Sequence, residues 1–250
     1  MAHLLEQVIE EPRACSYLSR EDAQLEVRVM VHVTAEELEA MLMRGWRRFG
    51  PCYFRPACAS CHECVGLRVV VDNFEPTKSQ RRAARAGSRL RRVVGPPRVS
   101  DDRLSLYAQW HTEREGARGW QPNAHTARSY ALDFAYPHPA AREVAFYDDA
   151  AGGKLVAVGL WDETPTCSSA AFFFFDPGYA SWSLGIANVV LGIADARRRG
   201  VPHVYLGYRV LECASLRYKA GFGPHELLRE RPEPGESPQW ESAETGRCCG

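Results

Sequence analysis

Three cysteines separated by two residues each, Cys58, Cys61 and Cys64, constrain this chain more than any other feature of its sequence. Side chains spaced so closely on a turning loop converge on one point, as thiolates must when they share a metal. Because an all-cysteine site leaves no open position for water, the sequence predicts a structural metal site. The spacing does not separate zinc from an iron–sulfur cluster. The alternative is a set of free thiols without a metal.

A tetrahedral site needs a fourth ligand, and Cys15 is the favoured one. It lies in an N-terminal segment, residues 1–20, that looks irregular and that a metal would hold in place. Cys52 precedes Tyr53 and can pack instead, and His62 is an alternative ligand. The predicted metal set is therefore Cys15, Cys58, Cys61 and Cys64.

A basic segment follows the cysteines. Eight Lys or Arg lie between Lys78 and Arg98, and no acidic residue occurs from Pro76 to Ser100. The whole chain has 31 basic and 31 acidic residues, so this segment gives a neutral protein one local positive field, which suits a nucleic acid. A solvated helix face is the alternative. Since Trp46 and Tyr53 could stack on bases, RNA is favoured, with contacts expected from Arg47, Arg48, Lys78, Gln80 and Arg81.

The remaining composition is that of an ordinary globular protein of 250 residues. The first residues lack a secretion signal, and no apolar run reaches membrane-spanning length, so a cytoplasmic protein without a membrane partner is expected. Nine cysteines at irregular spacing fit reduced thiols better than a disulfide framework.

Hydrophobic periodicity predicts an α+β fold. In the first half we expect a strand at 25–33, a helix from Thr34 to Gly45, a strand at 67–71 and a helix at 79–92. In the second half we expect helices at 100–111 and 126–134, strands at 143–147, 154–161 and 168–175, a helix at 183–199, a strand at 203–210 and a helix at 213–220. This βββαβα order is the layout of an acetyltransferase-like (GNAT-like) core, in a doubled or split arrangement with the cysteine-rich segment in front.

The expected domains follow from composition. Gly95-Pro96-Pro97 is the clearest linker and separates an N-terminal cysteine-rich, basic domain, 1–95, from an acyl-transfer domain, 96–230. The tail, 231–250, is rich in Pro, Glu, Gly and Ser and is expected to be disordered.

The junction between the strand at 168–175 and the following helix is a candidate reaction site. Acetyltransferases place a glycine-rich cradle there for the coenzyme A pyrophosphate. Here only Ser183-Leu184-Gly185 stands at that point, so coenzyme A is not expected as the donor. Asp176, before Pro177, is a candidate general base or a structural cap.

Two aromatic motifs lie near the C-terminus. Tyr205 and Tyr208 alternate at the end of a strand, where packing is the simplest role for one of them. Tyr218 and Lys219 put a cation beside an aromatic ring, a pair that can hold a phosphate or the terminal base of an RNA.

Taken together, these segments resemble the arginyl-tRNA–protein transferase family, and most closely its bacterial aspartate/glutamate leucyltransferase branch. The resemblance covers about residues 15–228, through the motifs Cys15-Ser-Tyr-Leu18, Arg44-Gly-Trp-Arg-Arg48, Tyr53-Phe-Arg-Pro56, Lys78-Ser-Gln-Arg-Arg82, Phe175-Asp-Pro177, Ser183-Leu-Gly185, Tyr205-Leu-Gly-Tyr208 and Tyr218-Lys219. It implies transfer of an amino acid from aminoacyl-tRNA to the α-amine of a protein that begins with Asp or Glu, which creates a degradation signal.

The resemblance also implies a doubled acetyltransferase-like architecture and a cysteine site for zinc or an iron–sulfur cluster. The chain departs from the family pattern at Leu216, where Met is usual, and at Arg209, where an aromatic is usual. Leucine is the favoured donor amino acid, and arginine is the alternative.

The chemistry assigns roles to the candidate residues. The donor ester is already activated, so the enzyme must align an amine with a carbonyl and stabilise the oxyanion. We expect Ser183, Gly185, Tyr208 and Asp176 at the acyl-transfer pocket, Tyr205, Tyr218 and Lys219 at the tRNA end, and Arg47, Arg48, Lys78 and Arg81 on RNA phosphate or the acidic acceptor. The rival hypotheses are a coenzyme A-dependent N-acetyltransferase and a non-catalytic zinc-ribbon RNA-binding module.

Overall fold

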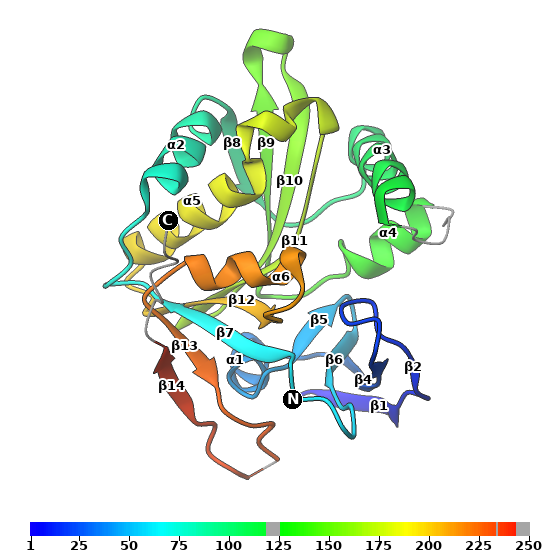
Figure 1. The fold of residues 1–250 in the computed structure, drawn as a ribbon. Coiled ribbons are helices and arrows are strands. Elements are labelled where there is room, and N and C mark those ends of the chain that lie inside the picture. The colour runs from blue at the N-terminus through cyan, green and yellow to red at the C-terminus, as the bar shows by residue number, and fades with distance from the viewer. Residues whose placement is uncertain (119–125, 234, 244–250) are drawn as a thin grey trace.

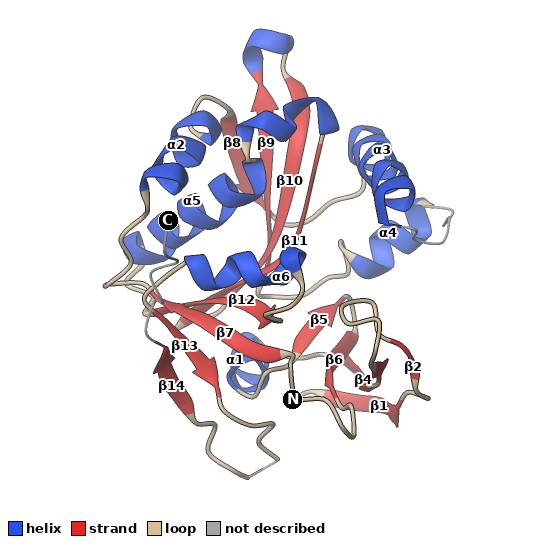
Figure 2. Ribbon diagram, in the orientation of Figure 1, coloured by secondary structure: helices blue, strands red, loops and turns tan. Residues whose placement is uncertain are grey.

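Residues 1–118, 126–233 and 235–243 are described by the computed structural model, in which two sheets are flanked by helices (Figures 1 and 2). The smaller sheet is antiparallel, with strand order β1-β4-β6-β5. Its strands are β1 (His3–Ile9), β4 (Leu25–Val31), β5 (Arg47–Phe49) and β6 (Cys52–Pro56). Residues 1–20, expected to be irregular, thus contain a strand, because β1 pairs with β4 along its length.

The helix α1 (Ala35–Met43) begins and ends as its sequence predicts. Thr34 and Glu37 form a reciprocal capping box at its start. Gly45, with φ of +81°, turns the chain out of the helix toward β5. A two-stranded hairpin of β2 (Arg13–Ala14) and β3 (Asp22–Ala23) lies before β4.

The larger sheet has the order β14-β13-β7-β12-β11-β10-β9-β8 and is mixed. Strands β11 and β12 pair in parallel, and the other described neighbours in this sheet are antiparallel. Its strands are β7 (Val65–Val70), β8 (Arg91–Gly95), β9 (Ala141–Asp148), β10 (Lys154–Glu163), β11 (Cys167–Phe175), β12 (His203–Arg209), β13 (His225–Leu228) and β14 (Trp240–Ala243). The predicted βββαβα order is present from β9 onward.

Helices cover both faces of this sheet. The helices α2 (Lys78–Gly87) and α5 (Leu184–Arg198) pack together on one face, and α3 (Asp101–Arg118) and α4 (Ala127–Asp133) lie on the other (Figure 1). Strand β10 supplies both cores, since Val156 and Ala157 pack on the α5 side and Leu155 and Val158 on the α3 side. A β-bulge between Leu155 and Ala157 interrupts the simple alternation of the strand. Shorter elements complete the chain: 3-10 turns η1 (Asp149–Ala151), η2 (Pro177–Trp182) and η3 (Tyr218–Gly221), and α6 (Ala214–Arg217).

The basic helix is shorter than its composition suggests. Expected at 79–92, α2 ends at Gly87, and Arg91 opens β8. A methyl group at Gly87 would stand 2.7 Å from the Cβ atom of Ala187, so this glycine lets α2 approach α5 closely. The helix ends there because tertiary packing outweighs the helix propensity of the arginines beyond it.

The sheet runs across the boundary expected at 95/96. Strands β7 and β8, which precede it, pair with β12 and β9, which follow it. The tail expected to be disordered contains β14, which pairs with β13. Within the described residues, no helix has the length and apolar character needed to cross a membrane.

Candidate functional site

The parallel pair in the larger sheet opens after three residues. Cys167, Ser168 and Ser169 of β11 pair with β12, and beyond Ser169 the two strands separate. Strand β11 continues beside β10, while β12 continues beside β7 in the lower half of the view (Figure 1). A V-shaped divergence between parallel strands exposes backbone groups that a ladder would otherwise pair.

A β-bulge lies on each arm of this divergence. In the pairing of β11 with β10, Ala171 is skipped, and in the pairing of β12 with β7, Leu206 is skipped. Bulges bend a strand and redirect its side chains. Both irregularities fall directly after the last β11–β12 pair, and they account for the separation.

Arg47 lies at the point of divergence. It comes from β5 of the smaller sheet, and its guanidinium donates hydrogen bonds to Ser169 Oγ (2.5 Å) and to the carbonyl oxygen of Ala170. Burial lowers its pKa from the ordinary value, although the cation remains charged. Ala170 is the first residue of β11 beyond its pairing with β12. Arg47 therefore satisfies the Ala170 carbonyl in place of a neighbouring strand.

Lys219 approaches the same point from the other side. Gly207 of β12 has φ of +76°, and a Cβ atom there would stand 3.4 Å from Arg47 Nε and 3.5 Å from Lys219 Nζ. Burial, and next the positive charge of Arg47, lower the pKa of Lys219 to about 7. Among the described residues, no carboxylate forms an ion pair with either cation. A charged arginine and a lysine that is about half protonated at pH 7 therefore flank Gly207, and neither forms an ion pair with a described carboxylate.

Tyr208 fastens the smaller sheet to this site. Its hydroxyl donates to the carbonyl oxygen of Gly45 at 2.7 Å, with that of Phe54 at 3.4 Å. Burial raises its pKa far above the ordinary value, so the phenol is neutral. Tyr205 is buried, and its hydroxyl accepts a hydrogen bond from Arg68 at 3.1 Å. Both tyrosines hold structure, whereas Tyr218 is 44% exposed.

Gln80 connects the basic helix to the loop that carries Lys219. Its side chain accepts from the backbone N–H of Thr77 in a capping box and donates to the carbonyl oxygen of Gly221 at 2.9 Å. The buried Gln80 side chain therefore holds the loop of Lys219 against α2, while Lys78 and Arg81 are exposed on the surface.

Arg48 is committed elsewhere. Its guanidinium pairs with Asp162, and both side chains are under 10% exposed. A second bond goes to the carbonyl oxygen of Gly50 at 3.3 Å. The alternation of β5 sends Arg47 and Arg48 in opposite directions, so only the first reaches the divergence.

The junction after β11 lies away from this cation pair. Asp176 is seven residues beyond Ser169, roughly 20 Å along the strand. Its carboxylate forms an ion pair with Lys154 Nζ at 2.6 Å and accepts the N–H of Gly178 at 2.8 Å, as the N-cap of η2. Of the two roles weighed for Asp176, the contacts are those of a cap.

Ser183 and Gly185 stand at the start of α5. Ser183 adopts a left-handed conformation with φ of +53°, and its side chain makes no capping bond. Gly185 lies against the ring of Phe173, 3.7 Å from where a Cβ atom would be. Ser183 and Gly185 thus lie apart from the divergence, as do Arg48, Asp176 and the exposed Lys78 and Arg81.

Comparison with models of known protein families identifies the family of this chain. Models of the arginine-tRNA-protein transferase match in two parts, the N terminus over residues 13–82 and the C terminus over residues 102–229. The chain belongs to this family. Every residue that meets at the divergence falls within these two matched segments.

Individual relatives agree. A protein from Campylobacter jejuni named aspartate/glutamate leucyltransferase is 31% identical over 226 residues, covering 88% of this chain and 91% of the relative. One of the same name from Halorhodospira halophila is 33% identical over 220 residues, covering 87% and 91%. Solved structures match more distantly: L-PGS from Bacillus licheniformis has a TM-score of 0.40 at 15% identity, covering 64% of this chain and 52% of that one.

The four cysteines expected to bind a metal share one neighbourhood in this transferase. Burial, and next the charges of Cys58, Cys15 and Cys61, raise the pKa of Cys64 to about 12. Sulfur atoms of Cys15 and Cys58 each accept a backbone N–H at 3.4 Å, from Tyr17 and Gln24. No group of three or more metal-binding side chains already stands in a ligand arrangement within the described ranges.

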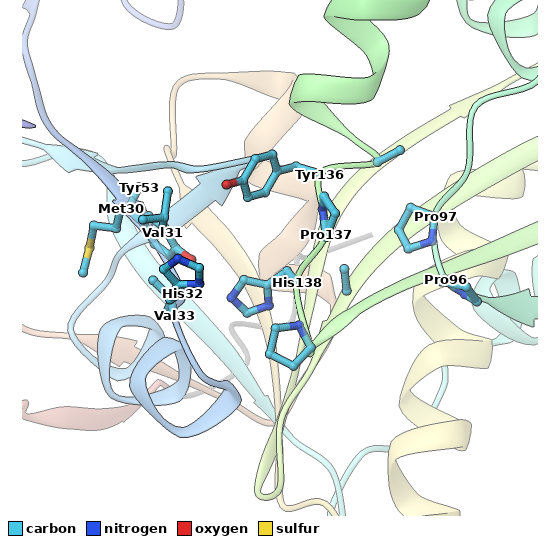
Figure 3. Close-up of a pocket in the computed structure, with 13 residues that line it drawn as sticks. Met30, Val31, His32, Val33, Tyr53, Pro96, Pro97, Tyr136, Pro137 and His138 are labelled. Carbon is cyan, nitrogen blue, oxygen red and sulfur yellow. The ribbon is translucent and has the colours of Figure 1, made fainter. Parts of the chain in front are cut away.

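A large pocket of the transferase lies apart from the cation pair. It has a volume of about 790 Å³ and is lined by β4 on one side and by residues 135–139 on the other (Figure 3). His138 Nδ1 accepts the N–H of Ala140, so the ring proton is on Nε2, a buried atom without a hydrogen-bond partner among the described residues. Burial and the charge of Arg48 lower the pKa of His138 to about 3.

Sequence reasoning missed Ser169 and Gly207, which complete the site. Gly207 stands inside the motif Tyr205-Leu-Gly-Tyr208, and a glycine between two strand residues is the available signal of a bulge or a close approach. Nothing local distinguishes Ser169 from its neighbours, because its role depends on Arg47, 122 residues away.

Proposed function

We propose that this transferase moves leucine from Leu-tRNA to the α-amine of proteins that begin with Asp or Glu. The names of the relatives support the reaction, and the cation pair of Arg47 and Lys219 is the structural observation that carries it. An anion bound beside Arg47 would keep Lys219 protonated, and the site therefore favours an anionic ligand. The carboxylate of the acceptor's first residue supplies one.

The position of the pair favours a carboxylate over an RNA phosphate. Arg47 of β5 and Lys219 of η3 meet beside Gly207 of β12, and we propose that the side chain of the acceptor's first residue binds between them. A neutral first residue would leave Arg47 and Lys219 uncompensated and would be rejected for that reason.

The cation pair also prepares the nucleophile. An α-amine has a pKa near 8, and nearby positive charge lowers it further, so the neutral amine forms at cytosolic pH. That amine attacks the ester carbonyl carbon, the new C–N bond forms, and the ester C–O bond breaks. The ribose hydroxyl leaves with the proton that the amine releases.

An acetyltransferase-like core is the architecture that we propose for the larger sheet. Three antiparallel strands, β9 to β11, precede α5, and β12 returns in parallel and then separates. The α5 start carries Ser183-Leu184-Gly185 in place of a glycine-rich cradle, so coenzyme A is not part of the proposed reaction.

Cys15, Cys58, Cys61 and Cys64 are proposed to hold zinc or an iron–sulfur cluster. Four thiolates that repel one another fit a cation between them, and backbone N–H bonds to sulfur are compatible with ligation. Such a group would fix the loop at 57–64 against the hairpin of β2 and β3. Metal and sulfide analysis of the purified chain, compared with Cys61→Ser, tests this without reference to activity.

The reaction is tested by transfer of radiolabelled leucine, and separately arginine, from charged tRNA to reporters that begin with Asp, Glu or Gln. We expect leucine on the acidic reporters alone. Arginine incorporation would overturn the donor, and equal labelling of the Gln reporter would overturn the role of the cation pair. Absence of transfer from either tRNA to any reporter would overturn the transferase proposal.

A further inference from the structure

Most arginines of this chain have an acidic or carbonyl partner. Arg91 and Arg92, which follow α2, pair with Asp149 and Asp195. Arg103 pairs with Glu143, and Arg55 pairs with Glu26. The surface of α2 differs, because no carboxylate among the described residues forms an ion pair with an arginine of this helix, although Arg81 donates a hydrogen bond to the carbonyl oxygen of Pro76.

Two arginines of α2 and one arginine in the turn after it form a line. Arg81, Arg85 and Arg89 are four residues apart, so they follow one face of the helix and the turn after it, at steps of about 6 Å. All three line a groove of about 410 Å³ between α2 and α5, with Ala84 and Val190 as its floor. Figure 1 shows these two helices side by side on one face of the larger sheet.

An aromatic ring stands at the end of this line. The Arg89 guanidinium lies 4.9 Å from the ring centroid of Trp182, and Trp182 makes an edge contact with Tyr179. Trp182 is only half-buried. Arginine beside an accessible aromatic is a combination typical of surfaces that bind RNA, since one side chain meets phosphate and the other a base.

The opposite end of the line leads to the reaction site. Gln80, one residue before Arg81, donates to the carbonyl oxygen of Gly221, two residues after Lys219. A polyanion lying along the groove would therefore have its end near the loop that carries Lys219.

We propose that Arg81, Arg85 and Arg89, ending at Trp182, form the docking groove for the phosphate backbone of the donor tRNA. The inference rests on the proposed function and deepens it, because it separates the two anions of the reaction. RNA phosphate binds on the α2 surface, and the acceptor carboxylate binds at the divergence. Regular steps along a helix fit the repeating charge of a nucleic-acid strand better than an acidic protein surface.

The test is the binding of uncharged tRNA to Arg85→Glu and to Arg82→Glu at several salt concentrations. Both residues belong to α2 and both variants change the charge equally, but only Arg85 lines the groove. We expect Arg85→Glu to raise Kd on the order of tenfold and to reduce the salt slope by about 1, with a clearly smaller effect for Arg82→Glu. Trp182→Ala is expected to weaken binding without changing the salt slope.

The outcomes separate the two proposals. Equal effects of Arg82→Glu and Arg85→Glu would overturn the groove in favour of a diffuse field. Unchanged tRNA binding by Arg85→Glu, in an enzyme that transfers leucine, would overturn the groove and leave the transferase function standing. A wild-type chain that binds anionic vesicles and no tRNA would overturn both.

Discussion

Replacement of Gly207 by alanine tests the geometry of the cation pair. With φ of +76°, this residue occupies a backbone region that disfavours a side chain by about 1–2 kcal/mol. For a chain of this size, that corresponds to a fall in Tm of about 2–8 °C. The added methyl group would stand 3.4 Å from Arg47 Nε and 3.5 Å from Lys219 Nζ. These are ordinary van der Waals contacts, so the methyl group would displace neither side chain but would fill the space between them.

Gly152→Ala is the matched control. Gly152 has φ of +72°, and no described atom lies within 4 Å of the position that an added methyl group would take, so it carries the same backbone penalty without the contact. Both variants should lose similar stability in thermal unfolding. Only Gly207→Ala should lose activity, with kcat/KM for an acidic reporter reduced about 10- to 100-fold, because its methyl group would occupy the space proposed for the acceptor carboxylate and misplace the substrate.

Two results would refute this reasoning. Gly207→Ala with wild-type kcat/KM would show that the space between Arg47 and Lys219 is not used by the substrate. Equal losses of activity in Gly207→Ala and Gly152→Ala would assign the effect to backbone strain alone.

Three further predictions concern the rest of the chain. Arg103→Met leaves the buried carboxylate of Glu143 unpaired and should lower the free energy of unfolding by about 3–5 kcal/mol in urea titrations; a loss below about 1 kcal/mol would contradict this. Asp176→Ala removes a cap and should cost about 0.5–2 kcal/mol while leaving kcat within a few-fold of wild type, whereas a large loss of kcat would restore Asp176 as a general base. Burial lowers the pKa of His138 to about 3, so the unfolded chain binds a proton at a higher pH than the folded chain does. The free energy of unfolding should therefore fall as the pH drops from 6.5 toward 3. His138→Phe should flatten that dependence, and an unchanged pH profile would contradict the burial of this ring.

Local signals predicted much of the architecture. The start of α1 at Thr34 and its end before Gly45 follow from rules that act within a few residues, and the structure confirms both of them. The length of α2 could not be predicted in the same way. Its end at Gly87 depends on Ala187, which is distant in sequence.

The candidate site likewise combines residues that the sequence predicted with an arrangement that it could not predict. Motif resemblance located Arg47, Tyr208 and Lys219, but it could not place them in space. Their convergence results from two bulges and from the separation of β11 and β12, which are properties of strand pairing. Arg47 and Arg48 are adjacent basic residues, and the alternation of β5 sends them in opposite directions. Arg47 lies at the divergence, whereas Arg48 pairs with Asp162.

Discrimination between acceptors that begin with Glu and acceptors that begin with Gln tests most directly whether Arg47 and Lys219 recognise the charge of the first residue. The two side chains have nearly the same shape and differ in charge, so the ratio of their kcat/KM values reports whether a cation pair reads the first residue. We predict a ratio on the order of 100 or more for the wild type, reduced at least about tenfold in Lys219→Met and largely restored in Lys219→Arg. A ratio that stays unchanged in Lys219→Met, with both reporters slowed equally, would contradict the account.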